Sequence, residues 1–278
     1  MVYVMPAQLA IAFADMVGEI AFYVARKHSD IAIDNLRSVF GIEKTDEDIK
    51  QIARQVFKNL ARNAVELVRF PKISADNIDG LVSIEGRDII DRELAKGNGA
   101  IIVTGHFGNW EIMSITLRIK GYPGAVVGRR IYFDKYDRYL NSLREHHDVN
   151  IIYRDESPKK ILRVLKDNKI MGILADQDVD SVDGVFVNFF DRPAYTPTAP
   201  VALAMATGAE IIPSFMIRRG LRHTFIMEKP VELVDTGDKT YDMVRNTQAW
   251  SDIFESYIKR YPEQWVWVHR RWKTQKAG

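Results

Sequence analysis

An acidic residue follows a histidine by five positions directly after an apolar segment, as His106 and Glu111. Histidine is the side chain that ordinarily gains and loses a proton near neutral pH, so it is suited to act as a general base. A carboxylate that accepts a hydrogen bond from the second ring nitrogen holds such a base in one tautomer. These residue types therefore indicate a general base at His106 that Glu111 orients.

The spacing alone is weak support for this interpretation. The chain has six histidines and 37 acidic residues among 278 positions, so about one such pair is expected by chance. His223 and Glu228 form a second pair, in a segment whose pattern predicts a strand. Residues five apart on a strand point to opposite faces, so this second pair should not meet. Around His106, Gly105 and Gly108 can form the turn that brings the first pair together.

Asn109 is the predicted N-cap of a helix that carries Glu111 in its first turn. The alternative to a catalytic role is a buried His106 whose hydrogen bonds are satisfied within the fold. A metal site that joins His106 and Glu111 to His146 and His147 is also conceivable, but no His-Glu-x-x-His helix supports it. We therefore predict no metal and no cofactor.

The pattern from about residue 81 onward alternates between strand and helix. Strands are predicted at 81–85, 100–104, 124–128, 150–153, 170–175, 210–216 and 223–231, and helices at 86–96, 109–119, 134–146, 157–167, 197–207 and 240–260. Such alternation predicts an α/β fold in which helices cover a sheet. Active residues of these sheets lie just beyond the carboxyl ends of the strands. His106 and the segment Asp176-Gln177-Asp178 both stand at such an end.

The first 70 residues have a helical pattern. Helices are predicted at 7–27, 30–40 and 46–69. Thr45 and Asp48 have the form of a capping box at the start of the third helix, and Pro71 ends the block. We therefore expect an N-terminal helical segment over residues 1–72, and an α/β domain over residues 73–278 that forms one compact unit.

The most apolar stretch of the chain is residues 1–25. Asp15 and Glu19 interrupt it, and a membrane span needs about 20 predominantly apolar residues, so we predict no convincing span. The periodicity is that of an amphipathic helix. Two interpretations stay open: a helix packed on the domain, and a helix that lies on a membrane surface.

Composition excludes several classes of protein. A formal net charge of +2 is close to neutral, so nucleic-acid binding is not expected. Two basic pairs, Arg129 with Arg130 and Arg270 with Arg271, are candidate contacts for an anionic substrate or a membrane surface. The absence of cysteine excludes disulfides, thiol catalysis and cysteine-based zinc sites. The chain also lacks a glycine-rich phosphate loop and a G-x-S-x-G turn.

Several blocks of sequence share their order and their motifs with one enzyme family. They are Asn35-Leu36-Arg37 with Phe40, Gly105-His106-Phe107-Gly108-Asn109-Trp110-Glu111, Ala175-Asp176-Gln177-Asp178 followed by residues 184–190 and 196–200, and residues 262–273. Together they resemble the bacterial lipid A late acyltransferases, the lauroyl/myristoyl transferases of the HX4(D/E) acyltransferase superfamily, over nearly the whole chain. The resemblance implies a central mixed sheet covered by helices, as in glycerol-3-phosphate acyltransferases, with an N-terminal helical segment.

The implied reaction moves a fatty acyl chain from a thioester to a lipid hydroxyl. The resemblance implies acyl carrier protein or CoA as the carrier of this acyl thioester co-substrate, and a lipid A precursor as the acceptor. It also implies a location at the cytoplasmic face of the bacterial inner membrane, either peripheral or anchored through the N-terminus. Two alternatives remain: the same chemistry on a lysophospholipid or another glycolipid, and a non-catalytic lipid-binding protein that has kept the fold.

The resemblance also gives expectations for individual residues. His106 is expected to act as the base with Glu111 as its partner, and amides of Gly108 and Asn109 are candidate donors to the oxyanion. Arg144 is similar to a functional arginine of the family. The expected substrate-binding residues are Arg144, Asp176, Asp178, Asn109, Arg129, Arg270 and Arg271. Asp176 is similar to a functional acid of the family and could hold the arginine or a substrate hydroxyl.

Overall fold

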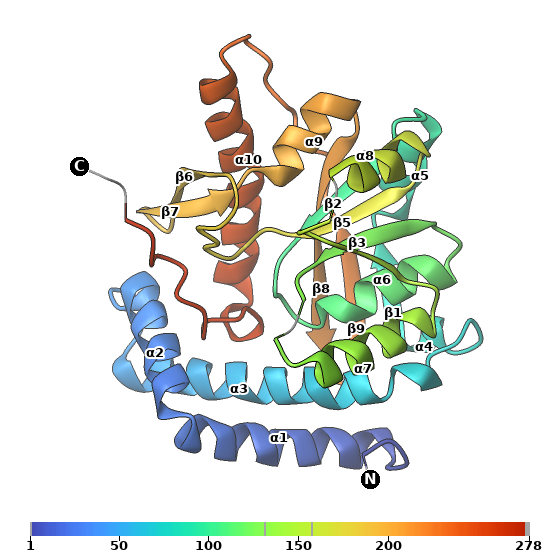
Figure 1. The fold of residues 1–278 in the computed structure, drawn as a ribbon. Coiled ribbons are helices and arrows are strands. Elements are labelled where there is room, and N and C mark those ends of the chain that lie inside the picture. Colours follow the sequence, from blue (N-terminus) through green and yellow to red (C-terminus); the bar gives the residue numbers. More distant parts are fainter. Residues whose placement is uncertain (1, 131, 157, 276–278) are drawn as a thin grey trace.

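Within the described residues, seven strands form a central sheet in the order β1-β9-β8-β2-β5-β3-β4 (Figure 1). The structure is a computed structural model that describes residues 2–130, 132–156 and 158–275. The strands are β1 (Val82–Glu85), β2 (Ala100–Thr104), β3 (Gly124–Gly128), β4 (Asn150–Tyr153), β5 (Ile170–Leu174), β8 (Glu210–Arg219) and β9 (Arg222–Met227). Neighbouring strands are parallel except β8 and β9, which are antiparallel. The predicted mixed α/β sheet is confirmed.

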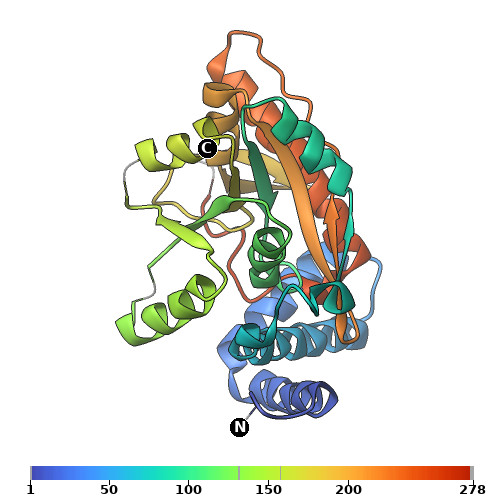
Figure 2. The same ribbon diagram turned by 90° about the vertical axis from the view of Figure 1, so that its right-hand side faces the viewer.

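Helices cover both faces of this sheet (Figure 2). They include α4 (Ile78–Leu81), α5 (Arg87–Ala95), α6 (Trp110–Ile119), α7 (Asp134–Glu145), α8 (Pro158–Lys166), α9 (Ala199–Thr207) and α10 (Lys239–Arg260). Side chains alternate across β2. Ile101 and Val103 pack in one core cluster with α8, α9 and α10, whereas Ala100 and Ile102 pack in another with α5 and α6. A strand buried on both faces has a continuous apolar sequence, which is why β2 was readily predicted.

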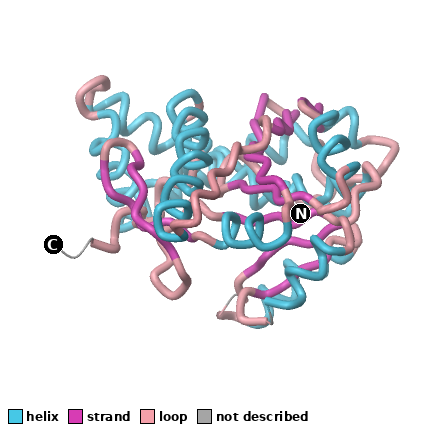
Figure 3. Tube along the Cα trace, turned by 90° about the horizontal axis from the view of Figure 1, so that it is seen from above, coloured by secondary structure: helices cyan, strands magenta, loops and turns pink. Residues whose placement is uncertain are grey.

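A small hairpin beside the main sheet was not predicted. It consists of β6 (Gly184–Phe189) and β7 (Arg192–Pro197), which pair antiparallel through a two-residue turn. The turn residues Phe190 and Asp191 both have positive φ, 54° and 57°. Such turns are usually marked in a sequence by Asn-Gly or Asp-Gly, and here that signal is missing. Seen from above, the strands of the main sheet lie between helices (Figure 3).

Three N-terminal helices confirm the predicted helical segment. They are α1 (Ala7–Val24), α2 (Arg26–Phe40) and α3 (Asp46–Val68), followed by a short 3-10 turn η1 (Phe70–Lys72). The capping box is present: the Thr45 hydroxyl accepts from the Asp48 amide, and the Asp48 carboxylate accepts from the Thr45 amide. α1 lies along α3 at the lower edge of the molecule in Figure 1.

The charged residues of α1 face α3 instead of solvent. Asp15 forms an ion pair with Arg62, and Glu19 forms one with Lys58 at 2.9 Å. Small residues, among them Ala14 and Gly18, are buried at this contact. The outward face is apolar and exposed, with Leu9, Met16, Val17, Ile20, Tyr23 and Val24. By length and composition α1 is long and apolar enough to cross a membrane, although the sequence pattern predicted no convincing span.

Candidate active site

Two glycines shape the turn between β2 and α6. A side chain at Gly105 would place its Cβ 2.7 Å from the Asp176 carboxyl group. Gly108 has a φ of 55°, and a Cβ there would lie 1.7 Å from the Met216 carbonyl oxygen. Only glycine fits both positions. The predicted glycine turn is confirmed, and it presents His106 just beyond the carboxyl end of β2.

His106 is held by Asp176 through two hydrogen bonds. The ring Nδ1 lies 2.9 Å from Asp176 Oδ1, and the His106 amide donates to Asp176 Oδ2 at 2.8 Å. The Trp265 indole donates to the same Oδ2 at 2.8 Å. Burial raises the pKa of the Asp176 carboxyl, but the charge and hydrogen bonds of His106, together with the Trp265 bond, outweigh burial and hold that pKa below its usual range. Asp176 is therefore an ionised, fully bonded acceptor.

This geometry fixes the tautomer of His106. A carboxylate can only accept a hydrogen bond, so the proton on the Asp176 side belongs to Nδ1. Within the described part of the chain, Nε2 makes no hydrogen bond. The His106 side chain is 26% exposed, and its ring packs edge-on against Trp110 with the centroids 4.8 Å apart. Nε2 is therefore available to accept a proton from a substrate.

The prediction that Glu111 orients His106 is wrong. Glu111 binds Arg144 through both oxygens, with Nε to Oε2 at 2.9 Å and Nη2 to Oε1 at 2.5 Å. Asp176 takes the place beside His106 because β2 and β5 are parallel neighbours, with Thr104 in register with Leu174. The carboxyl ends of neighbouring parallel strands meet at one edge. Asp176 and Arg144 do not pair with each other either, because Asp176 binds His106 and Arg144 binds Glu111.

Asn109 and Asp178, which the resemblance predicts to contact substrate, both have hydrogen-bond partners within the fold. Asn109 is the N-cap residue of α6, as predicted, but its side chain is buried and donates to Glu66 Oε2 at 2.6 Å. Asp178 is buried and accepts from the amide and hydroxyl of Thr274 at 2.8 and 2.7 Å. The Asn109 amide nitrogen and both Asp178 oxygens are thus bonded within the fold.

Three of the arginines that were predicted to contact substrate differ in burial: Arg271 is buried, whereas Arg129 and Arg270 are exposed. Arg271 is 1% exposed, and its guanidinium donates to the Tyr195 carbonyl and the Thr196 hydroxyl, both at 2.5 Å. Burial lowers the pKa of Arg271 to about 10, against the opposing charges of nearby acids. Arg271 is thus held within the fold, and its contact with an anionic substrate stays a prediction. Arg129 and Arg270 lie on the surface.

A largely apolar cavity lies between the sheet and α6. Its lining residues come from β2, α6, β3, α7 and β5 and include Ile102, Trp110, Met113, Leu117, Val126, Val127, Ile170 and Leu174. The Glu111–Arg144 ion pair also lines it. Trp110 lines this cavity and also packs against the His106 ring, so this one side chain contacts both the cavity and the candidate base. Among the described residues, no group of three or more His, Asp or Glu is placed to hold a metal ion.

Residues 1–274 match the family of bacterial lipid A biosynthesis acyltransferases. The chain belongs to this family. The match covers both the N-terminal helices and the α/β domain, including the turn that carries His106 and the strand end that carries Asp176.

Several relatives in the family have described activities. The chain is 32% identical to a lipid A biosynthesis lauroyltransferase of Escherichia coli, over 94% of this chain and 84% of the relative. It is 23% identical to a lipid A biosynthesis palmitoleoyltransferase of the same organism over the same shares. It is also 26% identical to a phosphatidylinositol mannoside acyltransferase of Mycobacterium tuberculosis, over 74% of this chain and 66% of the relative. The chain thus spans just under two thirds of that mycobacterial relative.

Sequence reasoning missed two functional features of this site. It named Asp176 but gave it another partner, because the order of strands in the sheet cannot be read from one sequence. It also missed the contact of Trp265 with Asp176, which joins residues 89 positions apart. The position of Asp176 just after a buried strand was the signal that could have placed it beside His106.

Proposed function

We propose that this chain transfers a fatty acyl chain from an acyl thioester to a hydroxyl group of a lipid. The observation that carries the proposal is the His106–Asp176 pair, whose ring packs against Trp110, a residue that also lines an apolar cavity. The pair provides a base, and the cavity provides an environment for an alkyl chain. Membership in the lipid A acyltransferase family supports the same reaction class.

The chemical step begins with His106. Nε2 takes the proton of the acceptor hydroxyl as its oxygen attacks the thioester carbonyl, and a tetrahedral intermediate forms. The Asp176 carboxylate stabilises the imidazolium through Nδ1. When the intermediate collapses, the carbon–sulfur bond breaks, and the leaving thiolate receives the proton from Nε2. The products are an ester and a free thiol, and the base returns to its starting state.

The oxyanion of the intermediate needs hydrogen-bond donors. The Gly108 amide cannot serve, because it donates to the Gln264 carbonyl at 2.8 Å. The side chain of Asn109 does not cap α6, so amides in the first turn of the helix remain unsatisfied donors at its positive end. We assign the oxyanion to this helix end, with the Arg144 guanidinium as a nearby positive charge.

The acyl chain of the donor fits the chemistry of the cavity beside Trp110. Burying an alkyl chain contributes roughly 0.8 kcal/mol for each methylene group. The open volume is about 80 Å³, which holds only part of a long chain. Binding a lauroyl-length chain therefore requires the lining side chains of α6 and β3 to move apart.

The relatives support a finer choice of substrates. The lipid A biosynthesis lauroyl- and palmitoleoyltransferases support a lipid A precursor as the acceptor, and we take acyl carrier protein as the donor, as the sequence resemblance implies. The mycobacterial relative acts on a phosphatidylinositol mannoside, which makes another glycolipid the second candidate acceptor. The exposed apolar face of α1 supports attachment to a membrane, and we place this at the cytoplasmic face, where acyl carrier protein is found.

The test combines purified protein and cells. Lauroyl-acyl carrier protein and lauroyl-CoA are each mixed with a total lipid extract from cells that lack the gene, and products are identified by mass spectrometry. We expect one class of glycolipid to gain a single acyl chain, and the same class to accumulate underacylated in the deletion strain. Lipid binding without acylation from either donor would contradict the proposal and favour a non-catalytic lipid-binding protein.

A further inference from the structure

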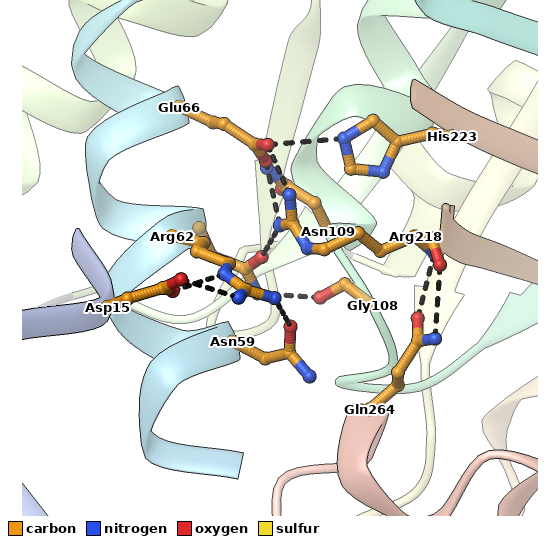
Figure 4. A network of polar contacts seen from close by, with 10 residues as sticks. Asp15, Asn59, Arg62, Glu66, Gly108, Asn109, Arg218, His223 and Gln264 are labelled. Atoms are coloured by element: carbon orange, nitrogen blue, oxygen red, sulfur yellow. Dashed lines mark hydrogen bonds and ion pairs between the residues drawn. The ribbon is translucent and has the colours of Figure 1, made fainter. Parts of the chain in front are cut away.

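Two side chains from α3 hold the turn that follows His106 (Figure 4). Asn63 Nδ2 donates to the Gly108 carbonyl oxygen at 2.6 Å. One helical turn later, Glu66 Oε2 accepts from Asn109 Nδ2, also at 2.6 Å. Residues three apart share one face of a helix, so two side chains of α3 can bond to two successive residues of the turn, Gly108 and Asn109.

Glu66 is itself fixed by two buried partners from β8 and β9. Arg218 donates to both of its oxygens, with Nη2 to Oε2 at 2.9 Å and Nη1 to Oε1. His223 Nε2 lies 3.3 Å from Oε1. Burial raises the pKa of the Glu66 carboxyl, but the His223 bond and the charge and bonds of Arg218 outweigh it and hold the pKa far below its usual range. Glu66 is therefore a rigid, ionised anchor.

The anchored turn reaches the base through the next residue. Trp110 follows Asn109 directly, starts α6, and packs against the His106 ring. On the other side, the His106 carbonyl oxygen accepts from the Val266 amide at 3.1 Å. The ring of His106 is thus located between Asp176 on one side and a tryptophan whose position depends on the turn.

We propose that Glu66 is a positioning residue for His106, acting through Asn109 and Trp110. This inference rests on the proposed function, in which His106 is the base. Glu66 does not touch the reacting atoms. It fixes the turn from α3, so that the imidazole and the first-turn amides of α6 keep the distance that the chemical step requires.

The test uses two variants and one matched control. Glu66→Gln keeps the shape but replaces one accepting oxygen with an amide donor, which cannot accept from Arg218 or Asn109. Asn109→Ala removes only the link and leaves Glu66 bonded to Arg218 and His223, so the fold is retained. Glu19→Gln makes the same chemical change at another partner of α3, the Lys58 ion pair, which does not contact the turn.

The full-length variants are compared with lauroyl-acyl carrier protein as donor and a bacterial total lipid extract as acceptor. We expect kcat to fall roughly 10- to 100-fold in Glu66→Gln and Asn109→Ala, the effect of misplacing a reacting group by about 1 Å, with KM unchanged. Glu19→Gln should keep the wild-type kcat. Wild-type kcat in both turn variants, with only a lower melting temperature, would overturn the proposal and leave Glu66 a structural residue.

A second measurement separates this inference from the proposed function. Protein labelled with ¹⁵N in histidine reports the environment of the His106 ring nitrogens without any substrate. The His106 signals should shift in Asn109→Ala and stay in place in Glu19→Gln. If the wild type transfers no acyl chain but the signals still shift, the proposed function fails and the positioning stands. Unshifted signals in Asn109→Ala would contradict the positioning whatever the activity.

Discussion

Among the residues that the structure describes, two histidine–carboxylate pairs differ in their surroundings. His106 bonds to Asp176 at 2.9 Å, and His223 lies 3.3 Å from Glu66. In the sequence each histidine has an acid five positions later, yet in the structure each pairs with an acid from a distant element. The His106 side chain is 26% exposed, whereas that of His223 is 3% exposed.

The partners of the two carboxylates explain the difference. Asp176 is bonded to His106 and Trp265, with no arginine or lysine among its described hydrogen-bond partners, so the imidazole is the basic group in direct contact with it. The negative charge of Glu66 is already balanced by Arg218, and His223 adds one further contact to the same carboxylate. Exposure and charge balance, not spacing, therefore distinguish a histidine that can work as a base from one that serves the fold.

The largest expected effect separates the two histidines. His106→Ala should lower kcat about 10²–10⁴-fold, the contribution of general base catalysis, in a chain that still folds. His223→Ala should lower the melting temperature, because it removes a buried partner of Glu66, and should reduce kcat far less. Steady-state kinetics and thermal unfolding of both variants check this. An equal loss of kcat in the two variants would contradict the assignment of His106, and not His223, as the base.

The next effect concerns the carboxylate beside the base. Asp176→Asn should lower kcat about 10²–10³-fold, because an amide can donate to Nδ1 and favour the wrong tautomer. Glu111→Gln should lower it less, since Glu111 binds Arg144 and not the base. The comparison is made by steady-state kinetics at one pH. A larger loss in Glu111→Gln would restore Glu111 as the residue that orients His106.

The fold was largely predictable, and the site only partly. Strands such as β3 and β4 have apolar residues at their centres, Ala-Val-Val and Ile-Ile, and their predicted bounds match the structure. The hairpin turn at Phe190 and Asp191 has positive φ without the usual turn residues, so its strands were missed. Local reasoning found the glycine turn around His106. The pairing with Asp176 depends on which strands are neighbours, a non-local property that periodicity does not encode.

The stability of the fold should depend on pH through the Glu66 carboxyl, the partner of His223 and Arg218. The pKa of Glu66 is lower in the folded than in the unfolded chain, where a glutamate titrates near 4.3. Its stabilising contribution is therefore present above about pH 4.3 and is lost as the pH falls through the folded pKa. The difference in free energy of unfolding between wild type and Glu66→Gln, measured with urea, should shrink from pH 6 toward pH 3. A constant difference over this range would contradict the ionised anchor.

The smallest effect concerns chain length at the cavity that Trp110 lines. Ser114 lines the cavity, and Ser114→Leu should shift the preferred donor toward shorter acyl chains by a few-fold, since a side chain then fills part of the space. Ser256→Leu is the matched control, because Ser256 is exposed and makes the same bond to a carbonyl three residues earlier. Competition between donors of different chain length, read by mass spectrometry, gives the ratio. An unchanged ratio in Ser114→Leu would place the acyl chain elsewhere.

The central claim is that Asp176, and not Glu111, holds His106 as a base with its proton on Nδ1. The most direct measurement is the long-range ¹H–¹⁵N spectrum of histidine-labelled protein at neutral pH, with the His106 signals assigned by their loss in His106→Gln. We predict the Nδ1–H tautomer in the wild type and in Glu111→Gln, and its loss in Asp176→Asn. A tautomer that survives in Asp176→Asn but is lost in Glu111→Gln would contradict the account.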